Sequence, residues 1–482
     1  MSRCRALLAL MFVLLAVAAM VARRAPQPSG TVAQLERAPR LEPELAGVVL
    51  PPNIAAPGLR INEPGTAWQV RLRGEHGSLT TAGRGRDLRF PLRRWHRLLA
   101  AHAGGELTLS VAARGADGRW QRFAPVSLSV AAEPIDRYLT YRLITPGYNL
   151  VRDVSLYQRD LTGYRERAVL TGRQVRGCVN CHCYQQGSGD KLTIQTRSNG
   201  YPSRTLLVSG RRVTAIRQPA GHGSWHPSGR LAAFSVNQVR QMFHAASEET
   251  RDAFDLSSSL VLMDAQTGQF TTAPALSQPG YLYTYPCWSP DGRALYFCRA
   301  PRNWPAGELI PPPGYDQVRY DLCRISYDPA SGAWGQAETV LAARDTGRSQ
   351  VFPRVSPDGR WLLYTECDYS CFPLYRQSSD LGLLDLATGQ RQPVTVNSER
   401  PEGWHSWSRD GRWVVFASKR EDGLFTKLYL SYFDRAGRLH PPLRLPQRRA
   451  DFYDTFWYAF NLPELATSPI RVSQGQLGRA AR

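Results

Sequence analysis

The chain has 482 residues, enough for two or three domains, and carries a formal net charge of +20. Only three of its sixty basic residues are lysines, and the arginines are spread along the whole chain. Because there is no basic run, zinc-finger spacing or recognition-helix pattern, the composition gives no support to nucleic-acid binding, and no nucleic-acid partner is expected.

Residues 1–24 have the pattern of a secretory signal. Arg3 and Arg5 precede an uncharged run from Ala6 to Ala22, and Arg23 follows it. The run is slightly short for a membrane span, and its cleavage site is blurred, so an uncleaved N-terminal anchor is the alternative. In either case we expect an exported protein of the periplasm or cell envelope, with contact to a membrane only through such an anchor.

The next segments divide into a tether, a small domain and a connector. Residues 25–48 are rich in Pro and Ala and are expected to be a tether. Over 49–134, short stretches of alternating polarity, such as those at Trp68 and Leu107, are separated by Gly- and Asp-rich turns, which predicts a small β-sandwich-like domain. Residues 135–177 are aromatic and charged without clear periodicity and are expected to be a connector.

Residues 178–182 form a Cys-x-x-Cys-His box. This spacing allows Cys178 and Cys181 to add to the vinyl groups of a haem while His182 ligates the iron, as in c-type cytochromes. Two alternatives stay open on spacing alone. The box and the adjacent Cys183 also suit a zinc site, and Cys-x-x-Cys describes a disulfide or dithiol redox pair.

Cysteines outside the box are compatible with export. Cys4 lies before the apolar run, and six more remain once Cys178 and Cys181 are set aside for haem. An even number allows disulfides, whose connectivity the sequence does not give, while buried free thiols are the alternative for each one.

The second half of the chain contains a repeat. Four segments each precede an apolar strand and start 63, 67 and 52 residues apart: Trp225-His-Pro-Ser-Gly-Arg, Trp288-Ser-Pro-Asp-Gly-Arg, Val355-Ser-Pro-Asp-Gly-Arg and Trp407-Ser-Arg-Asp-Gly-Arg. Pro and Gly in these segments set tight turns. The period predicts an all-β chain whose residues 178–465 form a C-terminal β-propeller, with five blades preferred and six as the alternative. Residues 466–482 are expected to be a flexible tail.

Strand-like stretches at Lys191, Arg204 and Arg212 supply the fifth blade, which follows the Cys-x-x-Cys-His box. The box then occupies the position at which other repeats carry Trp-Ser-Pro-Asp-Gly. This register predicts that the box lies at the first turn of its blade, near the rim of the central channel.

The repeats resemble those of the TolB-like propeller proteins, and the wider pattern is similar to an exported bacterial group often labelled cytochrome c biosynthesis proteins. The matching pieces cover roughly residues 50–465: Pro51-Pro-Asn-Ile-Ala, Ile135-Asp-Arg-Tyr-Leu-Thr-Tyr-Arg-Leu-Ile, the box at Cys178, Phe352-Pro-Arg-Val-Ser-Pro-Asp-Gly-Arg, His405-Ser-Trp-Ser and Asn461-Leu-Pro-Glu-Leu. The resemblance implies an exported protein with an N-terminal β-rich domain and a C-terminal propeller. Cys183 departs from the group, in which a small hydroxyl residue follows the box.

With His182 as the proximal iron ligand, a second ligand must come from elsewhere in the chain. His405 is the first candidate because it lies on an innermost strand where two other repeats carry proline. His226 replaces a turn serine, His222 lies just before it, and His244 belongs to a long loop, so these three are weaker candidates. The alternatives are an iron position open to solvent, or histidines that only form hydrogen bonds within their blades.

These patterns predict a haem c protein that transfers electrons or binds partners in a redox-linked way, with a redox or envelope protein as its partner. The sequence has no nucleophile elbow, His-Glu-x-x-His motif or phosphate loop, so a non-enzymatic role is favoured. Two other functions stay open: a TolB-like interaction scaffold whose Cys/His cluster binds zinc or forms a disulfide, and a haem enzyme with an open coordination site.

Overall fold

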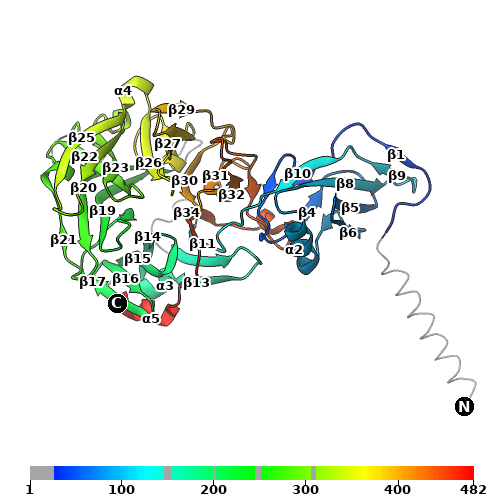
Figure 1. Ribbon diagram of the computed structural model, residues 1–482, viewed down its shortest axis with the longest axis horizontal. Coiled ribbons are helices and arrows are strands. Elements are labelled where there is room, and N and C mark those ends of the chain that lie inside the picture. The colour runs from blue at the N-terminus through cyan, green and yellow to red at the C-terminus, as the bar shows by residue number, and fades with distance from the viewer. Residues whose placement is uncertain (1–25, 146–153, 199–201, 245–250, 305–310) are drawn as a thin grey trace, which may run out of the picture. The chain divides into compact units, whose positions relative to one another are not determined.

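A computed structural model describes residues 26–145, 154–198, 202–244, 251–304 and 311–482, so the expected secretory signal lies outside the described residues. The chain splits into two compact units (Figure 1). Unit 1 comprises the residues up to Gly47, Ala56–Val130 and Pro446–Asp454, and unit 2 comprises Val48–Ala55, Ala131–Leu445 and Thr455–Arg482. In the described part of the chain, no helix has the length and apolarity needed to cross a membrane.

Unit 1 contains two sheets and one α-helix. This unit contributes six strands to the larger sheet: β1 (Val32–Gln34), β5 (Ala67–Gly74), β6 (Gly77–Gly83), β8 (Glu106–Arg114), β9 (Trp120–Arg122) and β10 (Val126–Val130). Strand β8 pairs with β5, β9 and β10. The smaller sheet has the order β2 (Leu41–Glu42), β4 (Leu59–Ile61), β7 (Asp87–Leu88). Helix α2 (Leu92–Ala101) buries Trp95, and the short 3-10 helix η4 spans Phe452–Asp454. The segment expected to be a tether therefore supplies β1 and β2.

Unit 2 contains six four-stranded antiparallel sheets among its described residues (Figure 1). Five of them follow the chain: β14 (Gly177–Gln185), β15 (Ser188–Ser198), β16 (Arg204–Ser209) and β17 (Arg212–Ile216); β18 (Gly223–Trp225), β19 (Leu231–Phe243), β20 (Arg251–Asp264) and β21 (Phe270–Thr271); β22 (Tyr281–Trp288), β23 (Ala294–Pro301), β24 (Asp321–Tyr327) and β25 (Trp334–Leu341); β26 (Ser349–Val355), β27 (Trp361–Cys367), β28 (Asp380–Asp385) and β29 (Gln390–Gln392); β30 (Glu402–Trp407), β31 (Trp413–Ser418), β32 (Lys427–Tyr432) and β33 (Leu443–Arg444).

The sixth sheet combines strands from both ends of the unit. Its order is β34 (Ala459–Ala466), β11 (Tyr138–Ile144), β12 (Ser155–Asp160), β13 (Glu166–Leu170). The first strands of the six sheets contact one another in a closed ring, β14–β18–β22–β26–β30–β34–β14. Because a closed ring of radial sheets is a β-propeller, the predicted fold is confirmed, with six blades rather than the preferred five.

The extra blade combines β34, at the end of the expected propeller segment, with strands of the expected connector. The expected connector, 135–177, holds β11, β12, β13 and the short helix α3 (Gly172–Val175). The expected tail, 466–482, contains helix α5 (Gln474–Ala480), whose Leu477 is fully buried against the blade formed by β14–β17. Shorter elements of the unit are β3 (Val49–Leu50), α4 (Ala343–Thr346), η1 (Pro274–Leu276), η2 (Tyr315–Gln317) and η3 (Pro373–Tyr375).

The repeated turns connect each innermost strand directly to the second strand of the same blade. In Ser289-Pro-Asp-Gly, the Asp291 carboxylate accepts hydrogen bonds from the Ser289 hydroxyl and the Arg293 amide, and Gly292 adopts φ +71°. Gly359 and Gly411 take the same left-handed conformation in their repeats. The turn therefore needs a glycine, which has no Cβ to resist positive φ.

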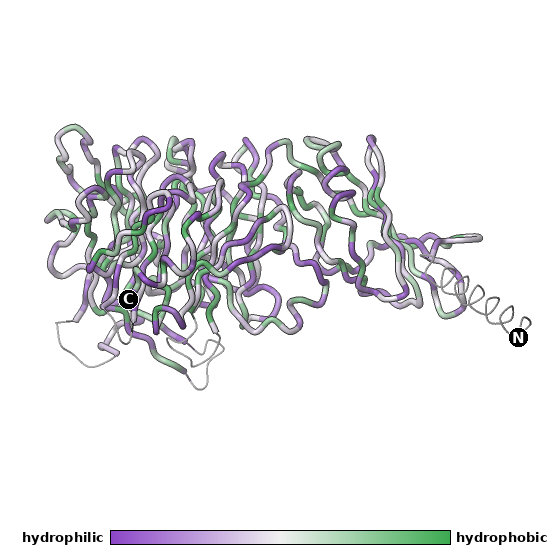
Figure 2. Tube along the Cα trace, turned by 90° about the horizontal axis from the view of Figure 1, so that it is seen from below, coloured by the Kyte–Doolittle hydropathy of each residue, from purple (hydrophilic) through white to green (hydrophobic). Residues whose placement is uncertain are grey.

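The propeller core lies between neighbouring sheets. One cluster joins Leu260 of β20 to Phe297 of β23, and another joins Leu363 of β27 to Phe416 of β31. Apolar and hydrophilic stretches alternate along the chain (Figure 2). Burial of both faces of each blade leaves the innermost strands to line the axis of the propeller, where the candidate site lies.

Candidate functional site at the propeller axis

Equivalent positions on the innermost strands can be recognised from a hydrogen bond that recurs between blades. A backbone amide donates to the side chain of the preceding blade in four cases: Tyr184 to Glu464, Trp288 to Ser224, Val355 to Cys287 and Leu465 to Ser406. In this register Cys183 is equivalent to Cys287, His182 to His405, and Cys181 to Trp404.

The Cys-x-x-Cys-His box lies within β14 and not at a turn. Tyr184 occupies the position of the repeat tryptophan Trp288, and the turn of this blade is Gln186-Gly187, with positive φ at both residues. The predicted alignment of the box with Trp-Ser-Pro-Asp-Gly is therefore wrong. The blade formed by β14–β17 turns through a shorter loop and lacks Ser-Pro-Asp-Gly. The box consequently lines the axis.

An aromatic layer closes the axis at the level of Cys181. It consists of His222, Tyr285, Phe352 and Trp404, which occupy equivalent positions on four blades. The His222 and Trp404 rings are nearly parallel, at 12° and 5.3 Å between centroids, and Tyr285 lies 4.6 Å from His222. Phe352 completes the layer at 4.9 Å from Trp404. The equivalent positions on β14 and β34 hold Cys181 and Leu462, which contribute no ring.

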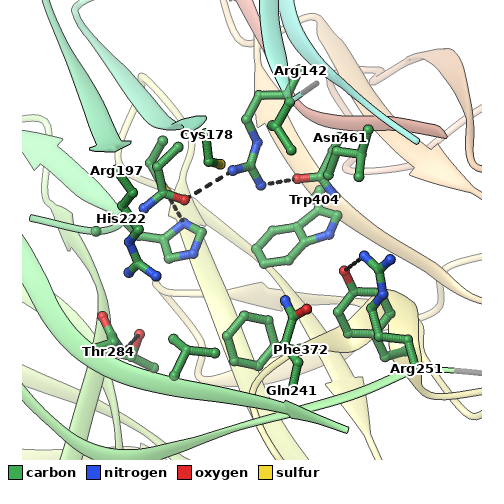
Figure 3. Close-up of a pocket in the computed structure, with 18 of the residues that line it drawn as sticks. Arg142, Cys178, Arg197, His222, Gln241, Arg251, Thr284, Phe372, Trp404 and Asn461 are labelled. Carbon is green, nitrogen blue, oxygen red and sulfur yellow. Dashed lines mark hydrogen bonds between the residues drawn. The ribbon is translucent and has the colours of Figure 1, made fainter. Parts of the chain in front are cut away.

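The arginine cavity, defined by Arg142, Arg197, Arg240 and Arg251, lies on one side of this layer and has a volume of about 340 Å³. Cys178, His222 and Trp404 line it (Figure 3). Cys181 lines it as well. The cavity therefore combines the two thiols of the box with cationic and aromatic walls.

The histidine cavity, defined by His182 and His405, follows further along the same innermost strands and has a volume of about 440 Å³. Arg354, Glu464 and Phe352 also line it. On each innermost strand that reaches both cavities, the residues before the aromatic layer line the arginine cavity and those after it line the histidine cavity. The strand β14 does the same, so the box is divided between the two cavities. Cys178 and Cys181 face one cavity, and His182 faces the other.

His182 is buried without any hydrogen bond. Neither Nδ1 nor Nε2 has a partner among the described residues, and the nearest carboxylate oxygen, Oε2 of Glu464, lies 3.6 Å from Nε2. Burial, with smaller contributions from Arg142 and Arg354, lowers the pKa of His182 to about 3. The ring is therefore neutral at physiological pH and has a lone pair free to bind a metal.

The thiols of the box are protonated. Burial raises the pKa of Cys178 and of Cys181, although Arg142 and Arg197 act in the opposite direction. Burial also raises the pKa of Cys183, whose Sγ points to the carbonyl of Tyr184. All eight described cysteines are free thiols, so the structure holds no disulfide among them.

Among the residues that the structure describes, no group of three His, Cys, Asp or Glu side chains converges on one point. The zinc interpretation of the box needs three or four ligands in a tetrahedron. The division of Cys178, Cys181 and His182 between two cavities gives it no geometric support.

His405 shares a cavity with His182 but already bonds to the preceding blade, at strand β27. Its Nε2 lies 3.1 Å from the carbonyl of Leu363, and its Nδ1 lies 3.4 Å from the hydroxyl of Thr365. His226 is engaged by Ser228 of its own turn and by the carbonyl of Gly292 in the turn of the following blade.

His222 belongs to the aromatic layer, and its Nδ1 lies 3.6 Å from Sγ of Cys181. Burial, with Arg142 next, lowers its pKa well below the usual value for histidine. His244 is more exposed and lies 3.6 Å from the carboxylate of Asp252. Of the four candidate second ligands, only His222 contacts the box.

Sequence reasoning does not find the arginines of the cavity or Glu464. Arg142 and Glu464 both lie in segments that carry the family resemblance, Ile135–Ile144 and Asn461–Leu465, so that resemblance was the one available signal. Arg142 reaches the axis because β11 pairs with β34, and its guanidinium donates to Asn461.

Comparison with solved structures returns β-propellers at low sequence identity. TolB from Acinetobacter baumannii is 16% identical, with 74% of this chain and 78% of TolB covered at a TM-score of 0.41. An apocarotenoid oxygenase from Synechocystis is 12% identical, covering 86% and 94% at 0.37, and the hydrazine synthase of Kuenenia stuttgartiensis is 14% identical, covering 54% and 65% at 0.31.

No family model and no curated protein matches the chain. TolB is among the similar structures, as the resemblance of the repeats implies, and the six sheets of the chain itself establish the propeller. Similarity at this level says nothing about ligand or activity.

Proposed function

We propose that this protein carries a covalently attached haem at the propeller axis and acts in electron transfer or redox-linked binding at the cell envelope. One observation carries the proposal. At the axis, two free thiols spaced for haem attachment adjoin a buried imidazole whose two ring nitrogens have no hydrogen-bond partner among the described residues.

The residues present fit a haem in their chemistry. Cys178 and Cys181 would hold the vinyl groups, His182 supplies a neutral nitrogen for the iron, and the arginines offer partners for two propionates. A bound haem would supply a one-electron couple. The surrounding propeller would exclude water from it, since His182 and Cys181 are 7% and 3% exposed.

The aromatic layer sets a condition on this proposal. Because Cys178 and His182 line cavities on opposite sides of the layer, one flat group can meet both only at the level of the layer. Cys181 belongs to that level. Attachment of a haem would therefore displace rings of the layer, with Trp404 and His222 nearest to the thiols.

Haem attachment is tested by expressing the full chain in cells that have a haem-attachment system. We expect a haem band that survives denaturing electrophoresis, and its loss in Cys178→Ser and Cys181→Ser. Cys183→Ser is the matched control and should keep the band. If the wild-type chain carries no covalent haem while a known c-type cytochrome in the same cells is loaded, the proposal is wrong.

The second iron ligand is tested on the loaded protein. His405→Leu or His222→Leu should convert the spectrum to high spin if that histidine binds the iron. Binding of carbon monoxide by the reduced wild-type protein would instead indicate an open position, as in a haem enzyme. Export, part of the same proposal because haem is normally attached outside the cytoplasm, is tested by fractionation and N-terminal sequencing.

A further inference from the structure

The arginine cavity contains a buried cation without an acidic partner. Arg142 is 9% exposed, and among the described residues no carboxylate lies within ion-pair distance of it. Its guanidinium donates to the amide oxygens of Asn180, at 3.1 Å, and Asn461, while its buried Nε has no partner. Burial of an unpaired charge is costly, and two neutral amide oxygens compensate only part of that cost.

The rest of the cavity reinforces this charge instead of neutralising it. Every charged side chain among its described lining residues is an arginine, and Arg197 and Arg240, like Arg142, form no ion pair within the described residues, although Arg197 partly offsets the rise in pKa that burial gives Asp255. The thiols and His222 are neutral, as their pKa shifts indicate. The two buried acids nearby on β20 are occupied, Asp252 by Arg376 and Asp255 by Asn237.

The walls between these cations are aromatic. Trp404, Phe372 and Tyr375 line the cavity, and Arg142, Arg197 and Arg251 surround it in Figure 3. A planar guanidinium pairs with a carboxylate through two parallel hydrogen bonds, and a flat apolar body packs on aromatic side chains.

We propose that this cavity binds the carboxylate of a flat, largely apolar ligand, with Arg142 as its buried anchor and Arg197 as a second contact. The site does not require covalent haem. The carboxylate can come from a haem propionate or from a free aromatic acid, and the experiment separates the two sources.

The test uses full-length protein without haem, prepared from cells that lack the attachment system, with the thiols reduced. Binding of two acids is compared with that of their neutral counterparts by calorimetry and tryptophan fluorescence: benzoate against benzamide, and iron-free protoporphyrin IX against its dimethyl ester. We expect at least one acid to bind about tenfold more tightly than its neutral counterpart. Selectivity for protoporphyrin alone indicates propionates, and selectivity for benzoate indicates a free acid.

Substitutions then assign the carboxylate contact. Arg142→Gln should weaken the selected acid about tenfold and leave its neutral counterpart unchanged. Because Arg142 is buried, its replacement could disturb the fold, and Arg197→Gln is therefore a second variant, at an exposed position that keeps the fold. It should also weaken binding of the acid. Arg212→Gln, on the exposed outer strand β17, is the charge-matched control and should have no effect.

Two results overturn the carboxylate site: equal binding of acid and neutral counterpart in both pairs, or equal weakening of both members by Arg197→Gln. Either result leaves the covalent haem test unaffected. Conversely, a chain that attaches no haem but selects an acid keeps the carboxylate site and loses the haem proposal.

Discussion

Replacing His182 in the haem-free protein should stabilise it, whereas the same replacement at His405 should destabilise it. The two histidines occupy equivalent positions in the propeller and both are buried, but only His405 has hydrogen-bond partners, at Leu363 and Thr365. An unsatisfied buried polar group costs about 1–3 kcal/mol. His182→Leu should therefore raise the free energy of unfolding by about 1–3 kcal/mol, and His405→Leu should lower it by a similar amount.

The pH dependence provides a second readout of the same contrast. Burial lowers the pKa of both histidines to about 3, from an ordinary value of 6.5. Between pH 6.5 and 3 the unfolded chain takes up protons that the folded chain does not, so stability is complete above pH 6.5 and falls with decreasing pH. The loss is about 1.4 kcal/mol per pH unit for each histidine. The difference in unfolding free energy between each leucine variant and wild type should therefore shift by about 2 kcal/mol in favour of the variant when the pH is lowered from 7 to 5.

Urea unfolding midpoints at pH 7 and pH 5 measure both effects. The reasoning is refuted if His182→Leu is destabilised as much as His405→Leu, since His182 would then have a partner that compensates its burial. Haem-loaded protein provides the complementary check. If His182 binds the iron, removing it from the loaded protein should cost stability, which reverses the sign seen without haem.

Three further predictions concern the groups around the box. Trp404→Ala removes a 4% exposed ring from the aromatic layer and should lower the unfolding free energy by about 3–5 kcal/mol in urea titrations, while speeding covalent haem attachment if the layer must open. Burial raises the pKa of Glu464 to about 7, so the folded chain holds a proton that the unfolded chain loses, and stability falls as pH rises from 4.5 to 7. Glu464→Gln removes this loss, so its unfolding free energy relative to wild type should be about 3 kcal/mol higher at pH 8 than at pH 4. Deleting the residues after Ser473 removes α5 with its buried Leu477 and should lower the thermal midpoint seen by calorimetry, with a deletion after Ala480 as the milder control.

The sequence predicts the propeller well because the information is local. A turn such as Ser289-Pro-Asp-Gly followed by an apolar strand identifies a blade without any knowledge of its neighbours. The missing sixth blade has no such turn. Its β34 and β11 lie more than 300 residues apart, and the strand pair forms only when the ring closes, for example between Leu139 and Leu465.

The candidate site is harder to predict because an irregular strand arranges it. In a regular strand Cys178 and His182 share a face, and Cys181 lies on the opposite face. The register of β14 against β15 shifts between Val179 and His182, and the shift places Cys181 beside Cys178 and sends His182 to the other cavity. Spacing identifies the chemistry of the box, but the bulge decides on which side of the aromatic layer each group lies.

The aromatic layer connects the box to the rest of the propeller. Four blades place a ring at the same position of their innermost strand, and the rings contact one another across the axis. The blade of the box has Cys181 at that position, in place of a ring. A thiol there removes bulk from the one place where a group attached to β14 would need room. Cys181 therefore supplies both the attachment point and the space beside it. Cys181→Phe should block both, leaving a folded propeller that takes neither a covalent haem nor a flat acid.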